Sequence, residues 1–429
     1  MWRQLRTKGW IIGVVIALVF SIAGPGRGRA ATGDNKTPLP QAAFVKGGDL
    51  WVQTGESAKP MTKGQSVHNP KWSFDNQWIA YSAGENEQEL WVLHVSKGES
   101  HLVSPKGGSW RSFQWAPDRN RLAFRNEQQL FTADPDQPDK HVEAAREIGN
   151  YSWLPDGSGM LVSSASKLLP DSGWTPVRIL KLPLSAIGEP GPEELLYTLP
   201  KPSDAFLAVG TSIFRWSADG RWIAFLATPT ASLSADSNAL CVLSSDGKTF
   251  RKIDDMVRNE QWFAWAGEGE KLAYIGGVGR EASSNKRLKV VELPNGTPIH
   301  YTPTGYVDQG FAWDGPNHII VSRAREMKPT NYGPAVRPFP SLVDIELTKG
   351  RTDPVTHPSD RHGDYQPTLV TVDHLAWVRS NRQTAEVRLS EVDGDHDRVW
   401  IPSLDLGANY YEQWNWSTVL DYAHPAREQ

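Results

Sequence analysis

The sequence predicts an all-β protein made of repeated units. Its composition, with 37 glycines and 31 prolines among 429 residues, favours many short strands joined by turns over long helices. Nineteen tryptophans are present, and many of them recur in segments that resemble one another. Between these segments, short runs alternate apolar and polar residues and turn at glycine-containing corners, which is the pattern of β-hairpins.

The first repeated element is a tryptophan strand followed by a turn and an apolar strand. NPKWSFDNQWIAYSAG at residues 69–84 and FRWSADGRWIAF at residues 214–225 are clear copies, and a weaker copy at residues 365–378 has Leu369 in the tryptophan position. The anchoring tryptophans are spaced by 43, 38, 63, 49 and 48 residues, as in blade-type repeats, and they are Trp72, Trp115, Trp153, Trp216, Trp265 and Trp313.

The second repeated element is a hairpin that follows each tryptophan unit. ELWVLHVSKGESHLVS at residues 89–104 and ALCVLSSDGKTFRKI at residues 239–253 are examples. Each unit therefore holds four antiparallel strands in about 40 to 50 residues, which predicts the blades of a β-propeller. One such sheet alone buries neither face, whereas sheets packed radially bury both faces against their neighbours. The proline-rich interval from Trp153 to Trp216 is expected to be one blade with surface insertions.

The two ends of the repeat are expected to close the ring. Residues 42–62 lack a tryptophan strand, and YYEQWNWSTVLDYA from residue 410 supplies one with little after it. Together they predict one composite blade. Seven internal units plus this composite favour eight blades, and seven would result if the weak unit near Leu369 merged with the C-terminal strand.

The N-terminus predicts a location outside the cytoplasm. Basic residues precede an apolar run at residues 10–24, so residues 1–31 are interpreted as a signal peptide or an uncleaved N-terminal anchor. Residues 32–41 are interpreted as a linker and residues 42–423 as the propeller. The protein is then secreted, periplasmic or anchored facing outside, with residues 10–24 as a membrane tether if the segment is retained.

Charge and cysteine content exclude two classes of interaction. The net charge is −4 and the basic residues are scattered, so there is no basic footprint for nucleic acid. Cys241 is the only cysteine, which rules out an intramolecular disulfide, and its apolar setting in ALCVL favours a small buried hydrophobe over a reactive thiol.

The repeats resemble those of TolB-like and WD40-like propellers. The resemblance rests on Trp72-Ser73-Phe74-Asp75-Asn76, on Trp216-Ser217-Ala218-Asp219-Gly220, and on the LWV strands at residues 50–52 and 90–92. It implies the propeller fold and, as in TolB, a periplasmic protein-binding role. Similar repeats form the propeller of the dipeptidyl and prolyl oligopeptidases, but the Gly-x-Ser-x-Gly elbow of their hydrolase domain does not occur in this sequence.

Two clusters suggest metal chemistry, and neither has the spacing of a known metal motif. Residues 393–397, DGDHD, are an oxygen-rich corner that calcium could use, although a solvated hairpin turn is favoured. His357, His362 and Asp364 form the second cluster. Some TolB-like propellers resemble pectic-oligosaccharide lyases, in which histidines hold a metal and neighbouring groups abstract a proton next to a carboxylate. Polar loop histidines are the favoured interpretation, so no metal site and no cofactor is predicted.

The loops that lead into the tryptophan strands are expected to lie on one face of the ring. Aromatic, amide and guanidinium side chains in these loops are typical of a recognition surface. The sequence therefore predicts an exported non-catalytic propeller that binds an envelope protein or a surface polymer. One alternative is a metal-assisted carbohydrate-active enzyme with His68 and His362 as ligands, and another is an assembly subunit with a membrane partner. The candidate binding residues are His68, Asn69, Trp110, Arg111, Tyr151, Gln261, Gln309, His362, Tyr365 and Tyr411.

Overall fold

The structure is a computed structural model that covers most of the predicted propeller. It describes residues 40–104, 108, 110, 112–170, 173–185, 188–203, 205–327 and 337–424. The predicted signal or anchor segment, most of the linker and Arg111 lie outside the described residues. Within these residues, no helix has the length and apolar character needed to cross a bilayer.

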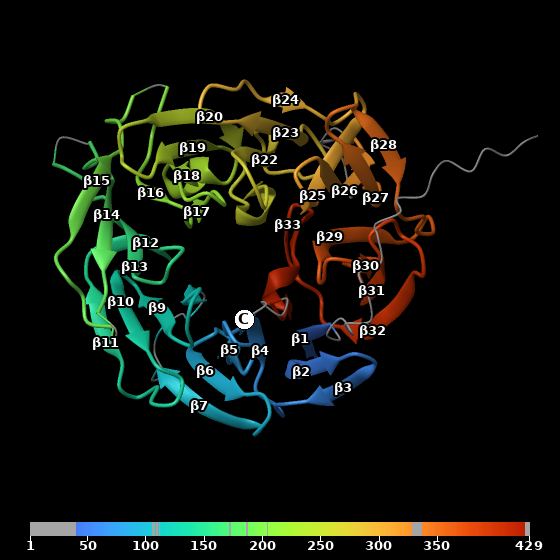
Figure 1. Cartoon of the computed structure of the whole chain (residues 1–429), viewed down its shortest axis with the longest axis horizontal. Helices are drawn as coiled ribbons and strands as arrows, with labels where there is room; N and C mark the ends of the chain where they lie inside the picture. The colour runs from blue at the N-terminus through green and yellow to red at the C-terminus, as the bar shows by residue number, and fades with distance from the viewer. Residues whose placement is uncertain are drawn as a thin grey trace, which may run out of the picture. The chain divides into compact units, whose positions relative to one another are not determined.

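Eight antiparallel sheets of four strands surround one axis as blades (Figure 1). In each blade the strands follow one another from the inner strand to the outer strand. The predicted all-β propeller fold, of the TolB-like and WD40-like type, is confirmed. Blades 1 to 3 are β4 (Val67–Trp72), β5 (Trp78–Ala83), β6 (Glu89–His94) and β7 (Glu99–Ser104); β8 (Phe113–Trp115), β9 (Leu122–Asn126), β10 (Gln129–Ala133) and β11 (Val142–Ala145); and β12 (Ile148–Trp153), β13 (Gly159–Ser164), β14 (Arg178–Pro183) and β15 (Glu194–Thr198).

Blade 4 has a broken inner strand, because β16 (Gly210–Thr211) and β17 (Arg215–Trp216) pair separately with β18 (Trp222–Thr228). It continues with α1 (Ala231–Ser234), β19 (Asn238–Ser244) and β20 (Phe250–Met256). Blades 5 to 7 are β21 (Phe263–Trp265), which follows η1 (Glu260–Trp262), β22 (Lys271–Gly276), β23 (Arg287–Glu292) and β24 (Ile299–His300); β25 (Tyr306–Asp314), β26 (His318–Arg325), β27 (Ser341–Glu346) and β28 (Arg351–Pro354); and β29 (Gly363–Leu369), β30 (His374–Ser380), β31 (Ala385–Glu391) and β32 (Arg398–Leu404).

The ends of the chain close the ring in blade 8. Its inner strand is the C-terminal β35 (Leu420–Tyr422), and its outer strands are β1 (Gln41–Lys46), β2 (Asp49–Thr54) and β3 (Ser57–Pro60). β35 pairs with β1 in the register Phe44 to Leu420 and Ala42 to Tyr422. The predicted composite blade is confirmed, and so are eight blades, because the weak unit at Leu369 builds a separate blade from β29 to β32.

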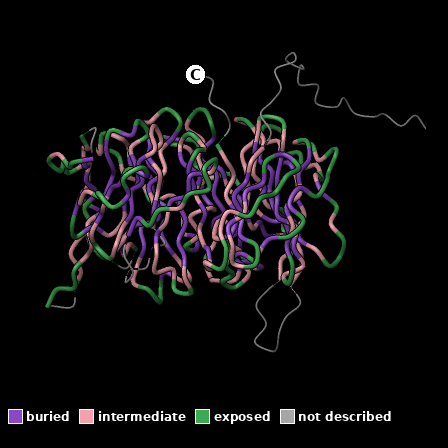
Figure 2. Tube along the Cα trace, turned by 90° about the horizontal axis from the view of Figure 1, so that it is seen from below, coloured by how far each residue is buried: buried purple, intermediate pink, exposed green. Residues whose placement is uncertain are grey.

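The core lies between blades and not inside any single sheet. The second strands are buried on both faces: every residue of β5 and every residue of β18 is buried. The outermost strands contact solvent, and all four residues of β3 are exposed. Figure 2 shows the same distribution, with buried residues in the interior and exposed residues at the ends and rim. Burial of apolar surface between successive sheets therefore drives the ring together.

The anchoring tryptophans also tie neighbouring blades by hydrogen bonds. In five of them, the indole Nε1 donates to a backbone carbonyl on the inner strand of the preceding blade. Only an indole supplies both the apolar bulk and this donor, which explains the repeated tryptophan. Trp216, on the broken strand of blade 4, is different because its Nε1 is buried without a partner among the described residues. The bonds run from Trp72 to Asp421 (3.3 Å), Trp115 to Lys71 (2.9 Å), Trp153 to Gln114 (3.2 Å), Trp265 to Arg215 (2.9 Å) and Trp313 to Ala264 (3.0 Å).

The serine and aspartate of the repeat shape the turn after the tryptophan. In blade 1 the Ser73 hydroxyl donates to Asp75 Oδ1 at 2.9 Å and accepts from the Trp78 backbone N–H at 3.0 Å. Ser217 and Asp219 make the equivalent bond in blade 4 at 2.6 Å. The serine oxygen accepts a hydrogen bond from a backbone N–H of the turn, and the aspartate oxygen accepts one from the serine hydroxyl. Serine and aspartate commonly stabilise tight turns in this way.

Candidate functional site

The loops that lead into the inner strands meet at one end of the ring, which we call the loop face. At this end several inner strands carry a β-bulge. The register shifts between His68 and Lys71 in β4 and between Tyr365 and Thr368 in β29. Asn69 and Gln366 lie at these bulges with φ of 53° and 47°, in the left-handed region that few non-glycine residues adopt. Bulges of this kind re-aim side chains and are frequent beside functional sites.

His68 and Asn69 are half-buried at the loop-face end of β4. The Asn69 amide donates to Glu87 Oε2 at 2.6 Å and to the Ser82 hydroxyl at 3.1 Å. These bonds hold the bulge in its unusual conformation. Among the described residues, His68 is the one histidine on an inner strand.

Three predicted binding aromatics are buried between blades, so the expectation that they present a ring to a ligand is corrected. Trp110, Tyr151 and Tyr365 are 4%, 0% and 3% exposed. The Tyr151 hydroxyl donates to the carbonyl oxygens of Ser112 and Ala123, both at 3.0 Å, and burial raises its pKa. Tyr151 lies on the inner strand β12 and packs against the preceding blade, and Tyr365 lies on the inner strand β29.

Trp110 and Tyr365 have equally closed surroundings. The Trp110 indole donates to the Gln88 carbonyl oxygen at 3.1 Å and its ring lies 5.8 Å from that of Phe124. The ring of Tyr365 lies 6.0 Å from that of Trp416, and burial raises its pKa. The rings of Trp110 and Tyr365 are therefore part of the packing beneath the loop face and do not lie on its surface.

Gln261, Gln309 and Tyr411 remain partly exposed on the loop face. The Gln261 amide donates to Asn415 Oδ1 at 2.9 Å, and the Gln309 carbonyl oxygen accepts from Trp262 Nε1 at 3.1 Å. Tyr411 is 43% exposed. A binding role for these residues stays a prediction.

A hairpin that the sequence did not indicate lies within the ring of blades (Figure 1). It consists of β33 (Ala408–Tyr410) and β34 (Gln413–Asn415), and η2 (Trp416–Thr418) follows it. Its two tip residues, Tyr411 and Glu412, have φ of 53° and 66°, where glycine or asparagine is usual. Contacts from blades 5 and 7 hold this strained turn. They are Ala282 N to Tyr411 O (3.0 Å), Gln413 Nε2 to Arg280 O (2.7 Å) and Arg382 Nε to Glu412 Oε2 (2.9 Å).

Two arginines on the loop face have no carboxylate partner among the described residues. Arg125 is the penultimate residue of β9 in blade 2 and donates to the Gly149 carbonyl oxygen of blade 3. Arg258 is exposed in the loop before blade 5. Burial lowers the pKa of Arg125, and the charge of Arg258 lowers it further. Because blades 2 and 5 are not neighbours, this influence of the Arg258 charge on Arg125 acts across the end of the ring.

We call this group of residues the axial site: His68, Asn69, Arg125, Arg258 and Gln261. It offers one imidazole, two carboxamides and two guanidiniums. Sequence reasoning found three of the five but missed Arg125 and Arg258, because scattered single arginines carry no motif. Only closure of the ring brings them together.

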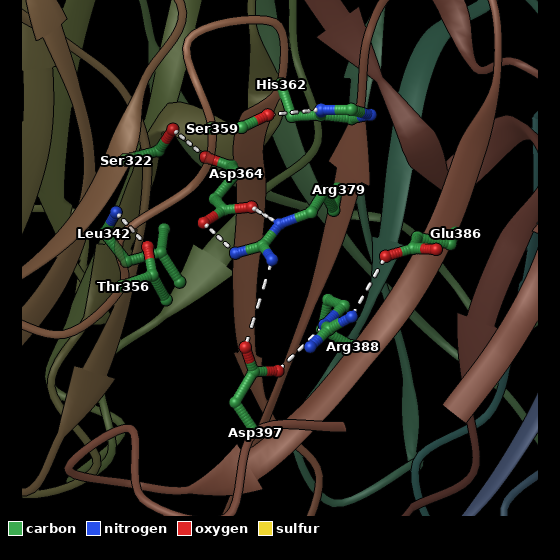
Figure 3. Close-up of polar contacts among 10 residues, drawn as sticks. All are labelled: Ser322, Leu342, Thr356, Ser359, His362, Asp364, Arg379, Glu386, Arg388 and Asp397. Atoms are coloured by element: carbon green, nitrogen blue, oxygen red, sulfur yellow. Dashed lines mark hydrogen bonds and ion pairs between the residues drawn. The ribbon is translucent and has the colours of Figure 1, made fainter. Parts of the chain in front are cut away.

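The histidine and aspartate cluster at residues 357–364 is built into blade packing (Figure 3). Asp364 is fully buried and accepts from Arg379 Nε and Nη2 at 2.7 and 2.8 Å. His362 Nδ1 lies 2.8 Å from the Ser359 hydroxyl, and His357 is exposed. Asp364 is therefore committed to a guanidinium and does not pair with the histidines.

The acidic corner at residues 393–397 is likewise engaged in ion pairs. Figure 3 shows Asp397 between Arg388, at 2.8 Å, and Arg379, at 3.9 Å. His396 Nδ1 lies 2.8 Å from Glu391 Oε1. Over the described ranges, no three His, Cys, Asp or Glu side chains group as metal ligands, so His68 and His362 do not fit the metal centre of the alternative expectation.

Comparison with known proteins establishes the fold. No family model matches the chain, and a search of curated proteins gives no significant match. Among solved structures, a puromycin hydrolase S511A mutant complexed with PGG has a TM-score of 0.50 at 14% identity, covering 80% of this chain and 55% of its own. A eukaryotic initiation factor has a TM-score of 0.50 at 9% identity, covering 86% and 98%. An oligogalacturonate lyase in complex with manganese has a TM-score of 0.47 at 12% identity, covering 86% and 97%.

These likenesses correct the prediction of a non-catalytic binding module. The puromycin hydrolase, with a TM-score of 0.50, is named as an enzyme, and this finding overturns both the binding-only function and the expectation that the chain is not an enzyme. That prediction took the absence of a contiguous catalytic motif in the sequence as a sign that the chain is not an enzyme. A propeller can, however, assemble a site from loops that lie far apart in the sequence. The chain spans about half the length of the puromycin hydrolase. At these identities the likeness concerns the fold, and an activity for this chain is a proposal.

Proposed function

We propose that this protein is an enzyme that acts on an acidic oligosaccharide held at the axial site. The main supporting observation is that the charge of Arg258 acts on Arg125 across the end of the ring. Neither guanidinium has a carboxylate partner among the described residues. A guanidinium forms paired, charge-assisted hydrogen bonds with a carboxylate. Two of them at one place suit a chain that carries a carboxylate on successive sugars.

The neighbouring amides suit the rest of such a substrate. Gln261 uses one amide N–H on Asn415 and keeps the other, together with its oxygen, for sugar hydroxyls, whereas Asn69 donates to Glu87 and Ser82 and offers its oxygen as an acceptor. Asn69 is fixed by Glu87 and Ser82, so its position is set before a ligand arrives. A polar site held in place in this way loses little entropy on binding.

The chemistry that this set of groups supports best is elimination at a uronate. Arg125 or Arg258 neutralises the carboxylate, which makes the proton on the adjacent carbon more acidic. His68 removes that proton as general base, the electron pair forms a carbon–carbon double bond, and the glycosidic oxygen leaves and takes a proton from water. The step uses these side chains and water alone.

The predicted location agrees with this substrate class. A polymer outside the cell requires an exported enzyme, and export is what residues 10–24 predict. Location outside the cytoplasm and tethering through this segment remain part of the proposal.

Incubation of the purified full chain with oligomers of galacturonate, mannuronate and glucuronate tests the proposal. Elimination produces a conjugated double bond that absorbs ultraviolet light, whereas hydrolysis produces new reducing ends without that absorbance. We expect the absorbance from one of these oligomers, and at least about a hundredfold lower kcat in the His68→Gln variant.

The matched control is His101→Gln, at an exposed histidine on the outer strand β7. It should retain the parent activity. The proposal fails if none of the oligomers is cleaved, or if His68→Gln cleaves them as fast as the parent does.

A further inference from the structure

A cavity of about 380 Å³ opens on the loop face over the outer half of blade 5. It lies between the end of β22, the strands β23 and β24, and the loop that follows β24. Its volume is in the range of small-molecule sites. The side chains that line it are Asn285, Arg287, Lys289, His300, Thr302 and Thr304.

The lining is basic and contains no carboxylate. Arg287, Lys289 and His300 face it together, and the remaining side chains are hydroxyls and one amide. Three acids outside the lining bond to it: Asp254 accepts from Lys289 Nζ at 2.6 Å, Glu326 accepts from Arg287 Nη2 at 2.6 Å, and Asp308 accepts from the Thr302 hydroxyl. Each cation keeps further N–H groups, because an ammonium has three donors and a guanidinium five.

Lys289 is held in place by its bond to Asp254. Asp254 also accepts from the Tyr274 hydroxyl at 2.9 Å, and burial with this carboxylate raises the pKa of Tyr274. The Lys289 side chain is 15% exposed, so its position is set before a ligand binds. A fixed donor loses little entropy when it engages an anion.

Two glycines keep the cavity open. A Cβ at Gly277, where φ is +124°, would lie 1.7 Å from the Asn285 carbonyl oxygen. A Cβ at Gly276 would lie 2.8 Å from Asp254 Oδ2 and 3.3 Å from Lys289 Cε. Any larger residue at either place would displace the groups that position the cations.

We propose that this cavity binds the oxyanion group of a small molecule about the size of a monosaccharide. Lys289 and Arg287 contact the anion, with His300 and the Thr304 hydroxyl completing its shell, because the Thr302 hydroxyl donates to Asp308. Phosphate, sulfate and carboxylate share this chemistry. The site is separate from the axial site and does not depend on the activity proposed for it.

Isothermal titration of the full chain tests this inference with inorganic phosphate, glucose 6-phosphate and glucuronate as probes. At least one probe should bind with Kd below about 10 mM. A sugar phosphate that binds more tightly than both phosphate and glucuronate identifies a phosphorylated ligand, and tighter glucuronate identifies a carboxylate.

The test variant is Lys289→Gln with Asp254→Asn, which removes the cation together with its half-buried carboxylate partner and keeps polar side chains at both places. Its affinity for the bound probe should fall at least about tenfold. The control is Lys252→Gln with Asp255→Asn, a comparable pair on β20 whose side chains lie 2.9 Å apart and are more exposed. Absence of binding by the parent, or equal affinities in the two double variants, overturns the inference, and unchanged melting temperatures confirm that the variants fold.

Discussion

The arginines of blades 6 and 7 and those of the axial site have opposite surroundings. Arg323 and Arg379 are almost buried, and each forms a bidentate pair with a fully buried aspartate, Asp308 or Asp364. Arg125 is also partly buried, and it donates a hydrogen bond to one backbone carbonyl oxygen, that of Gly149. The arginines of blades 6 and 7 are thus neutralised by carboxylates, whereas Arg125 and Arg258 have no carboxylate partner among the described residues. Two such cations at one end of the ring are candidates for binding an anionic ligand.

The largest expected effect comes from breaking a packing pair. Asp364→Ala leaves Arg379 nearly buried with only Asp397, at 3.9 Å, as a further acidic partner. Removing one partner of a buried pair is strongly destabilising, so we expect the free energy of unfolding to fall by about 3 kcal/mol in urea denaturation. Asp397→Ala, at a partly exposed carboxylate, should cost less than about 1 kcal/mol. Similar losses in both variants would show that Asp364 is not a structural partner.

The next effect concerns Lys286, a buried cation with only carbonyl partners. Its Nζ donates to the carbonyl oxygens of Val278, Gly279 and Ser284, and burial lowers its pKa from 10.5 to about 8. The unfolded chain then binds more protons between about pH 8 and pH 10.5, so the free energy of unfolding should rise through that window by about 2 to 3 kcal/mol. Thermal unfolding across this pH range measures it, and Lys286→Met should abolish the contribution. An unchanged pH profile in that variant would contradict the assignment.

A smaller effect separates the tryptophans that bridge blades from the one that does not. Trp115→Phe removes the 2.9 Å bond to Lys71 and some apolar area, whereas Trp216→Phe removes area alone. We expect Trp115→Phe to be the more destabilising by about 1 kcal/mol in matched denaturation curves. Equal losses would mean that the indole donors add nothing to packing.

The smallest effect concerns the hairpin of β33 and β34. Glu412 pairs with Arg382 at 2.9 Å and with Arg337 at 3.8 Å, so Glu412→Gln should weaken the anchoring of the tip by about 1 kcal/mol. Hydrogen exchange at residues 408–415 should become faster, with the remaining blades unaffected. Glu386→Gln, at the partner of Arg388, is the control and should leave the hairpin unchanged.

The fold could be predicted from the sequence because the blades repeat the same local pattern of tryptophan strand, turn and hairpin. Tryptophan spacing, hairpin corners and the missing strand at the N-terminus lead to eight blades and a composite closure. The burial of two predicted binding aromatics could not be predicted. Tyr151 and Tyr365 lie on the inner strands β12 and β29, where a neighbouring blade covers them. The hairpin contact between Gln413 and Arg280 joins residues 133 positions apart, and no local pattern records it. The axial arginines became visible only once the ring was closed.

The most direct test of the central claim is the affinity of the axial site for the acidic oligosaccharide that we propose as its substrate. Isothermal titration compares inactive His68→Gln protein with the same protein carrying Arg125→Gln and Arg258→Gln. A control carries Arg351→Gln instead, at an exposed arginine on β28. We predict at least about a tenfold loss of affinity for the axial pair alone, with no more than about 1 kcal/mol change in stability. Equal affinity in all three proteins would show that the unpaired arginines do not hold the substrate.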